Sequence, residues 1–252
     1  MFNAGKFIHE CLNSVSLLVT NNRFSFEHIL VDDCSTDDSW KIIQKCRFPH
    51  LRSFRLKENA GSSNARNFAV KKTDAHYLFF LDQDDVIFQN SLQLLCEHTN
   101  AGNPEWLYGD FLRTDKNLAY QLGQDYYGFQ FKNSKDLLCS IFSGQHFFQQ
   151  NCLYRRHSFE SVGGFDMRIA IYQDLDLCIR FALTGHVPLY VPGPLYAHRF
   201  HENNLSKLYG RENNPRAHKE DLKSLYETYG ISLRSMLTSR QVRKIEDFLT
   251  ET

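Results

Sequence analysis

Three carboxylates lie within four positions of the stretch YLFFLDQDDVI, where Asp82, Asp84 and Asp85 follow a short apolar run. Their mutual repulsion is relieved by solvent, by basic side chains or by a cation. Carboxylate oxygens suit hard cations such as Mg²⁺ and Mn²⁺, and a magnesium site often combines one or two protein carboxylates with substrate phosphates. The three acids therefore fit either a solvated turn or a site for a metal and a phosphate.

A second acidic pair, Asp32 and Asp33, ends another short apolar run, HILV. In parallel sheets, ligands bind outside the carboxyl ends of the strands. Both acidic clusters are expected at such ends. This makes a site for a metal and a phosphate about as well supported as two solvated turns. Both interpretations stay open on this evidence.

The pattern of apolar residues predicts the elements that position these acids. In the first 80 residues, strand-like and helical runs alternate: strands at 28–31, 51–56 and 76–81, and helices at 6–19, 35–46 and 64–72. This alternation predicts an α/β fold with a mostly parallel sheet that helices flank. Later segments predict strands at 105–114 and 150–156, and helices at 134–142, 174–184, 215–229 and 232–250. The last two helices are expected to separate at Gly230.

Composition excludes some classes of protein. The formal net charge is +0 and the pI about 7.2, so the chain lacks the basic field of a nucleic-acid binder. Its seven scattered cysteines form no Cys-x-x-Cys pair and predict buried thiols in a reducing compartment. No run reaches the roughly 18 to 20 apolar residues that span a bilayer, and no signal peptide is recognisable. The predicted location is the cytoplasm, with peripheral attachment to the inner face of the membrane left open.

Seven stretches, taken in order, resemble the family 2 glycosyltransferases of the GT-A fold, which is a Rossmann-like nucleotide-binding fold. They are FNAGKFIHECLNSV, ILVDDCSTDDS, ENAGSSNARNFA, FFLDQDD, YRRHSFESVGGFD, QDLDLCIRFALTG and HRFHENNLS. The resemblance implies a GT-A domain over residues 1–202. Its donor half covers about 1–100 and its acceptor half about 101–202. Residues 203–252 are expected to form a helical C-terminal extension.

The resemblance implies transfer of a sugar from a nucleotide diphosphate-sugar to an acceptor hydroxyl, with inversion at the anomeric carbon. It also implies a divalent cation, Mn²⁺ or Mg²⁺, which neutralises charge on the leaving diphosphate as a Lewis acid. By analogy, the acceptor is a growing surface polysaccharide or a lipid-linked glycan. The sequence leaves the sugar, the linkage and the oligomeric state open.

The resemblance also assigns residues to these tasks. The donor-binding residues are Asn3, Asp32, Asp33, Asn59, Arg66 and Asp82, and the metal ligands are Asp82, Asp84 and His201. Direct displacement needs one base for the acceptor's proton, and Asp174 in the family's Glu-Asp motif is predicted to be that base. The helix dipole alone also favours an acid there. Arg66 has a structural alternative, pairing with the strand-end acids, while Asp85 is expected to order its loop and His198 to be structural.

The sequence departs from the family pattern at three places. Gln173 stands where the family has Glu, which removes a charge beside Asp174, and Cys34 replaces a common Gly, which suggests a turn without positive φ. The family also has a buried strand before the FN turn. We therefore expect the natural chain to start upstream of residue 1, or this chain to be a fragment or altered copy.

Three other kinds of protein compete with this interpretation. The first is a catalytically inactive binding or scaffold protein of GT-A fold, which Gln173 and the missing strand favour and which Asp82, Asp84 and Asp174 oppose. The second is a nucleotidyltransferase, but NAGKF is too slight for its Gly-rich, basic loop. The third is a dinucleotide-binding dehydrogenase, and the Gly-x-Gly-x-x-Gly pattern of that class is absent.

Overall fold

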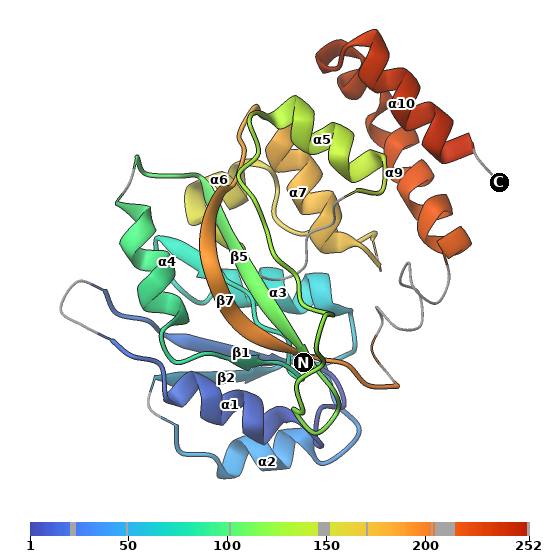
Figure 1. Ribbon diagram of the computed structural model, residues 1–252. Coiled ribbons are helices and arrows are strands. Elements are labelled where there is room, and N and C mark those ends of the chain that lie inside the picture. The colour runs from blue at the N-terminus through green and yellow to red at the C-terminus, as the bar shows by residue number, and fades with distance from the viewer. Residues whose placement is uncertain are drawn as a thin grey trace.

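The computed structural model is an α/β protein and describes residues 1–20, 24–48, 50–100, 102–145, 152–169, 171–202, 204 and 215–250 (Figure 1). The strands are β1 (His28–Asp32), β2 (Leu51–Arg55), β3 (Tyr77–Phe79), β4 (Val86–Ile87), β5 (Trp106–Thr114), β6 (Cys152–Arg155) and β7 (Leu189–Arg199). The helices are α1 (Ile8–Ser16), α2 (Ser39–Lys45), α3 (Ser62–Val70), α4 (Ser91–Thr99), α5 (Ser134–Phe142), α6 (Arg156–Ser161), α7 (Gln173–Leu183), α9 (Pro215–Met236) and α10 (Ser239–Thr250).

The strands form two sheets of mixed direction, in which more residues pair in parallel than antiparallel. One sheet is the parallel pair β1–β2, and the other has the order β3-β6-β5-β7-β4. In the second sheet only β5 and β7 pair in parallel, whereas β3–β6, β5–β6 and β4–β7 are antiparallel. The alternation of strands and helices predicted the parallel pair in the first half. The alternation gave no information on the directions of β6 and β4. β6 lies between β3 and β5, β4 lies beside β7, and each is antiparallel to these neighbours.

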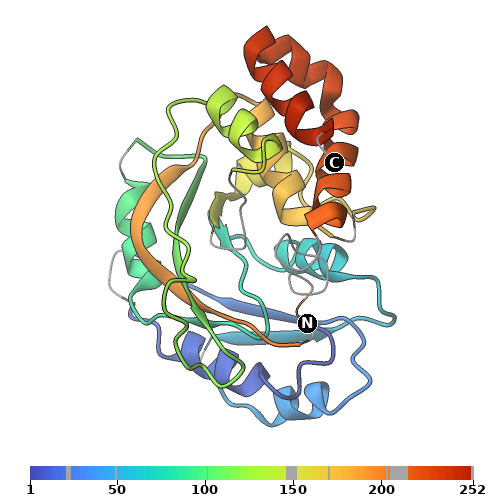
Figure 2. The ribbon, with the colours of Figure 1, turned by 45° about the vertical axis from the view of Figure 1, so that its right-hand side comes forward.

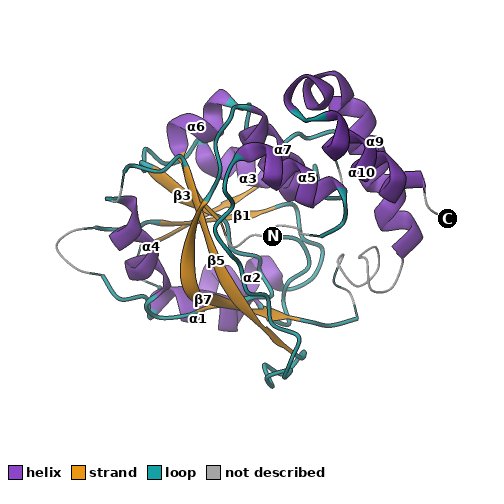
Figure 3. Ribbon diagram, turned by 45° about the horizontal axis from the view of Figure 1, so that its top comes forward, coloured by secondary structure: helices purple, strands orange, loops and turns teal. Residues whose placement is uncertain are grey.

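Helices cover the sheets at both ends of the molecule. In Figure 1, α1 and α2 lie below β1 and β2, while α5, α7, α9 and α10 gather at the other end. Figure 2 shows β5 and β7 curving as a long ribbon between these ends, and Figure 3 shows α4 on the outer side of that ribbon. The largest apolar core includes Trp106, Tyr108, Phe142 and Phe181, all with 0% exposure. Burial of such rings is the main force that holds α5 and α7 onto the sheet.

Two local predictions are corrected. Cys34 has a φ of 62°, so the turn after β1 does use the left-handed conformation that the Gly-to-Cys departure had argued against. The last two helices do not separate at Gly230, because α9 continues through it to Met236. A glycine inside a helix costs only about 1 kcal/mol relative to alanine, which packing outweighs. The helix break falls instead at Thr238, which exchanges capping hydrogen bonds with Gln241.

The first residue lies against the free edge of β1. The Met1 ammonium donates to the Val31 carbonyl at 2.8 Å, and the Asp33 amide donates to the Met1 carbonyl at 2.7 Å. These two bonds repeat the pattern of a parallel ladder. In the described part of the chain, no ladder joins β1 to β3. Side chains of β1 and β3 instead line one cleft, which Met1 also lines.

Two predictions from composition concern membrane spans and thiols. Within the residues that the structure describes, no helix combines the length and apolarity needed to cross a bilayer. All seven cysteines are described and all carry free thiols, with Cys11, Cys139, Cys152 and Cys178 buried. The prediction of buried thiols holds for these four, whereas Cys34, Cys46 and Cys96 are half-buried.

Candidate functional site

A cleft of about 2010 Å³ runs between the two sheets and along the ends of α3 and α7. Typical small-molecule pockets have volumes of about 300–1,000 Å³. This one is larger because it continues into the space between β1 and β3, where side chains of both strands line it. Most of the predicted site residues line the same cleft: Asp33, Asn59, Arg66, Asp82, Asp84 and Asp174.

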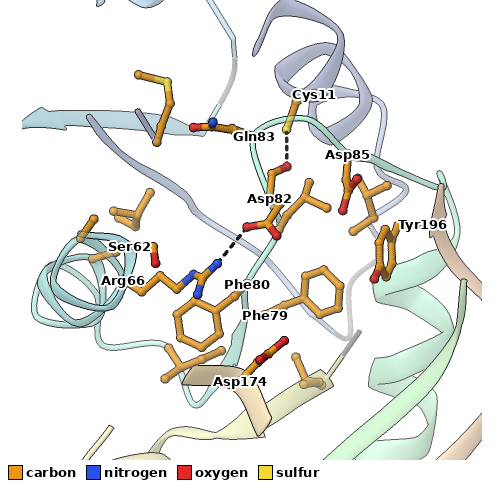
Figure 4. Close-up of a pocket in the computed structure, with 18 of the residues that line it drawn as sticks. Cys11, Ser62, Arg66, Phe79, Phe80, Asp82, Gln83, Asp85, Asp174 and Tyr196 are labelled. Atoms are coloured by element: carbon orange, nitrogen blue, oxygen red, sulfur yellow. Dashed lines mark hydrogen bonds and ion pairs between the residues drawn. The ribbon is translucent and has the colours of Figure 1, made fainter. Parts of the chain in front are cut away.

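Arg66 and Asp82 form the ion pair at the centre of the cleft (Figure 4). The Arg66 Nη2 lies 2.9 Å from the Asp82 Oδ1, and the guanidinium also lies 5.2 Å from the centre of the Phe165 ring. Asp82 lies three residues after the end of β3, and Arg66 lies in the second turn of α3. The Asp82 carboxylate keeps 42% of its side-chain exposure, so it is open to a ligand.

Asp174 projects into the cleft from the first turn of α7, on the side of Arg66 that Figure 4 shows below the guanidinium. Removal from water raises the pKa of its carboxyl to about 6, while the Leu175 amide bond and the charge of Arg66 oppose the shift. A carboxylate with such a pKa is ionised at neutral pH and is more basic than an ordinary aspartate. Its chemistry therefore suits a general base.

Asp84 contacts the predicted metal ligand His201. Its Oδ2 lies 2.9 Å from the His201 Nε2 and 3.3 Å from the Asn204 Nδ2. Over the described ranges, no three His, Cys, Asp or Glu side chains gather into a metal-binding group, and Asp82 pairs with Arg66. One carboxylate and one imidazole are nonetheless ligand types of Mn²⁺, and phosphates commonly complete such shells. Asp84 and His201 thus fit part of a coordination shell.

Asp85 and His198 have the structural surroundings that the sequence predicted. The buried Asp85 accepts a hydrogen bond from the Arg199 amide at 2.9 Å, and its other oxygen lies 3.5 Å from the His198 Nδ1. Burial raises the pKa of Asp85 to about 6, against the effect of His198. Asp85 thus ties the loop after β3 to the end of β7.

The acids after β1 are held by other parts of the protein. Asp33 accepts hydrogen bonds from the amides of Ala60 and Gly61, at 2.9 and 2.8 Å. The fully buried Asp32 accepts from the Ser35 amide and pairs with Arg55 at 3.2 Å. Both carboxylates therefore order loops, whereas only Asp33 also lines the cleft.

The two predicted asparagines lie in different places. Asn59 is exposed and lines the cleft. The Asn3 side chain instead accepts from the Thr36 amide at 2.9 Å, and its backbone amide donates to the Ser35 Oγ at 3.0 Å. Asn3 therefore joins the N-terminus to the turn after β1.

A family comparison accounts for this arrangement. Residues 1–163 match the model of glycosyl transferase family 2, which is well over half of the chain. The chain belongs to glycosyl transferase family 2. The matched residues include Asp33, Asp82 and Asp84, whereas Asp174 on α7 lies beyond them.

Several relatives are named as glycosyltransferases. The poly(ribitol-phosphate) β-N-acetylglucosaminyltransferase TarP of Staphylococcus aureus is 31% identical over 112 residues, which are 44% of this chain and 34% of TarP. The glycosyltransferase GlyA of Streptococcus pneumoniae is 25% identical over 224 residues, 83% of this chain and 31% of GlyA. The matched segments span about a third of the length of these two relatives.

A solved structure supports the fold. The structure of S. aureus TarS 1–349 in complex with UDP-GlcNAc superposes with a TM-score of 0.73 and 20% identity, over 99% of this chain and 69% of that chain. At this identity the likeness shows the fold alone. The predicted GT-A-like α/β fold of this family 2 chain is therefore confirmed.

Two contacts of this family 2 site were not predicted. The Gln173 side chain donates to the Ser62 Oγ at 3.0 Å and so joins α7 to α3. His218, on α9, lines the cleft and lies 2.8 Å from the hydroxyl of Tyr172. The sequence predicted a helix over residues 215–229. It gave no sign of the element that this helix packs against.

Proposed function

We propose that this chain transfers a sugar from a nucleotide diphosphate-sugar to an acceptor hydroxyl, with inversion at the anomeric carbon. The observation that carries the proposal is the meeting of three groups in one cleft: the Arg66–Asp82 ion pair, the Asp84 carboxylate, which also contacts His201, and the Asp174 carboxylate. The first two suit a charged diphosphate, and the third suits proton removal.

In the proposed reaction the acceptor hydroxyl gives its proton to the Asp174 carboxylate. The acceptor oxygen forms a bond to the anomeric carbon as the bond from that carbon to the diphosphate oxygen breaks. The nucleoside diphosphate leaves with the electron pair. A base with a pKa near 6 holds the proton more strongly than an ordinary aspartate and is still free to accept it at neutral pH.

The donor side consists of residues that the resemblance names. We assign Arg66 to the diphosphate, because a guanidinium binds phosphate oxygens in a fixed geometry. Asp33 and Asn59 line the part of the cleft next to β1, where a nucleoside would lie. Asp32 and Asn3 act through the loops that they order.

Asp84 and His201 would hold the divalent cation, Mn²⁺ or Mg²⁺. When bound, such a cation supplies positive charge next to the departing diphosphate. Arg66 and Asp82 would bind the donor in the same cleft, which Asp174 also lines.

The acceptor class follows from the names of relatives. TarP and TarS act on poly(ribitol phosphate) by name, and GgaB of Bacillus subtilis is named for minor teichoic acid biosynthesis. We therefore propose a surface glycan or a lipid-linked glycan as acceptor, reached by peripheral contact with the membrane from the cytoplasm. Free thiols suit that reducing compartment. Residues 1–202 would form the transferase domain and 203–252 its helical extension.

A thermal-shift panel of nucleotide diphosphates and nucleotide sugars, with and without Mn²⁺, tests the donor site. We expect one nucleotide to raise the melting temperature more with Mn²⁺ than without it, and its sugar conjugate to be hydrolysed slowly. Stabilisation without any turnover would favour the inactive binding protein. If no nucleotide diphosphate stabilises the protein with metal, the assignment of the donor site is wrong.

A further inference from the structure

The C-terminal helix α9 contacts the predicted catalytic helix α7 directly. Figures 1 and 2 both show α9 beside α7, and its buried leucines Leu222, Leu225 and Leu233 belong to the same core as Leu175 and Leu177. This packing fixes the position of α9 against the site. Two polar contacts within it are more specific than apolar packing.

The first polar contact lies just before α7 begins. The His218 Nδ1 lies 2.8 Å from the Tyr172 hydroxyl, and the two ring centres are 5.3 Å apart. His218 is only 6% exposed. Tyr172 has a φ of 61° and a ψ of 25°, a left-handed conformation that side chains other than glycine adopt at a cost of about 1 kcal/mol or more. The contact with His218 offsets part of that cost.

The second polar contact lies one turn further along α7. The buried Asp176 accepts a hydrogen bond from the Tyr229 hydroxyl and forms an ion pair with Arg180 at 2.6 Å. Arg180 in turn donates to the Val162 carbonyl, also at 2.6 Å. The Asp176 amide donates to the Tyr172 carbonyl at 2.9 Å, so the two contacts with α9 meet in one turn.

Asp174 lies between these two contacts. We propose that α9 positions the catalytic carboxylate, with His218 and Tyr229 as positioning residues that hold the first turn of α7 at Tyr172 and at Asp176. This inference rests on the proposed function, because it assumes that Asp174 is the base. It makes the C-terminal extension part of the catalytic machinery, although neither of its two side chains contacts the reacting atoms.

The test uses paired variants of the full chain. His218→Leu and Tyr229→Phe each remove one contact, whereas His218→Asn keeps a polar atom at the place of Nδ1. Tyr226→Phe is the matched control, since the Tyr226 hydroxyl on the same helix bonds to Glu246 on α10 rather than to α7. Turnover of the stabilising nucleotide sugar and hydrogen exchange of a peptide over residues 171–178 are measured for each protein.

We expect His218→Leu and Tyr229→Phe to lower kcat about tenfold with little change in the donor KM, because small displacements of a catalytic group cost up to ~100-fold in rate. His218→Asn should recover most of the rate, and exchange over 171–178 should speed up only in the two variants that lose a contact. If His218→Leu and Tyr229→Phe both keep the wild-type kcat, the inference is overturned.

Exchange separates this inference from the proposed function. If the wild-type protein turns over no nucleotide sugar, the proposed function fails, and exchange then decides whether α9 holds the first turn of α7. Unchanged exchange in both variants would overturn the positioning role. Faster exchange in them, but not in Tyr226→Phe, would support it.

Discussion

Two carboxylates line the same cleft in different surroundings. Asp33, after β1, accepts hydrogen bonds from two backbone amides, those of Ala60 and Gly61. Asp174, in the first turn of α7, accepts one from the Leu175 amide, and burial raises its pKa to about 6. Asp33 lies in the half of the molecule with the smaller core, whereas α7 is anchored in the larger one.

Asp33 therefore orders the backbone through its hydrogen bonds, whereas the pKa of Asp174 is raised, which makes it a stronger base. Hydrogen bonds to a carboxylate favour its charged form, and burial without enough of them favours the neutral form. A strongly packed helix can hold a poorly solvated carboxylate in place, because the apolar core supplies the stability that the carboxylate does not. Asp174 lies on such a helix, because Leu175 and Leu177 anchor α7 in the larger core.

The largest effect is expected for Asp174→Asn. Loss of a general base costs about 10³-fold in rate, or about 4 kcal/mol in activation free energy. The melting temperature should not fall, because an amide in this place avoids the cost of ionising a carboxyl whose pKa is raised. Turnover and thermal unfolding of both proteins check this. A variant that retains a tenth or more of the rate would remove Asp174 from the mechanism.

The sequence predicted the order of elements in the first 80 residues and the acids at their ends, because both depend on local patterns. Asp82 does follow β3, Asp33 follows β1, and Asp174 lies in the first turn of a helix. The directions of β6 and β4 and the contact of His218 with Tyr172 depend on residues far apart in the chain. The different roles of Asp33 and Asp174 depend on such neighbours too, so motif spacing alone did not reveal them.

The next effect concerns the gap between β1 and β3. An apolar, β-branched strand of about six residues fused before Met1 would extend the ladder that Met1 begins and fill the adjoining part of the cleft. Burial of two or three such side chains, less the cost of ordering the strand, is expected to raise the free energy of unfolding by about 3 kcal/mol. Denaturant unfolding measures it, with a Gly-Ser extension of equal length as control. Equal stability of the two fusions would contradict the prediction.

Arg66→Ala comes third and tests the donor side. Loss of a charge-assisted contact to phosphate should weaken nucleotide binding by about 2 kcal/mol, roughly thirtyfold. Arg234→Ala is the control, because that arginine pairs with Glu246 away from the cleft. Calorimetric titration with the stabilising nucleotide measures the loss. Equal affinities of the two variants would leave the Arg66–Asp82 pair a structural role only.

The pH profile gives a smaller effect. Asp174 accepts a proton only when ionised, so kcat should rise with pH up to about 6 and then level off, with about a tenfold loss at pH 5. Asp85 also has a pKa raised to about 6. Asp85→Asn should therefore keep the midpoint if Asp174 sets it. A midpoint near pH 4 in the wild-type protein would contradict the raised pKa.

Asp33→Asn has the smallest expected effect and bears directly on the comparison. An asparagine offers one acceptor oxygen, so the amide of Ala60 or Gly61 loses its partner. Because both of these residues are exposed, water compensates in part, and the loss of unfolding free energy should be about 1 kcal/mol. Denaturant unfolding and nucleotide titration of the same variant separate loop order from binding. Unchanged stability with a tenfold loss of nucleotide affinity would mean that Asp33, like Asp174, acts on the substrate rather than on the backbone.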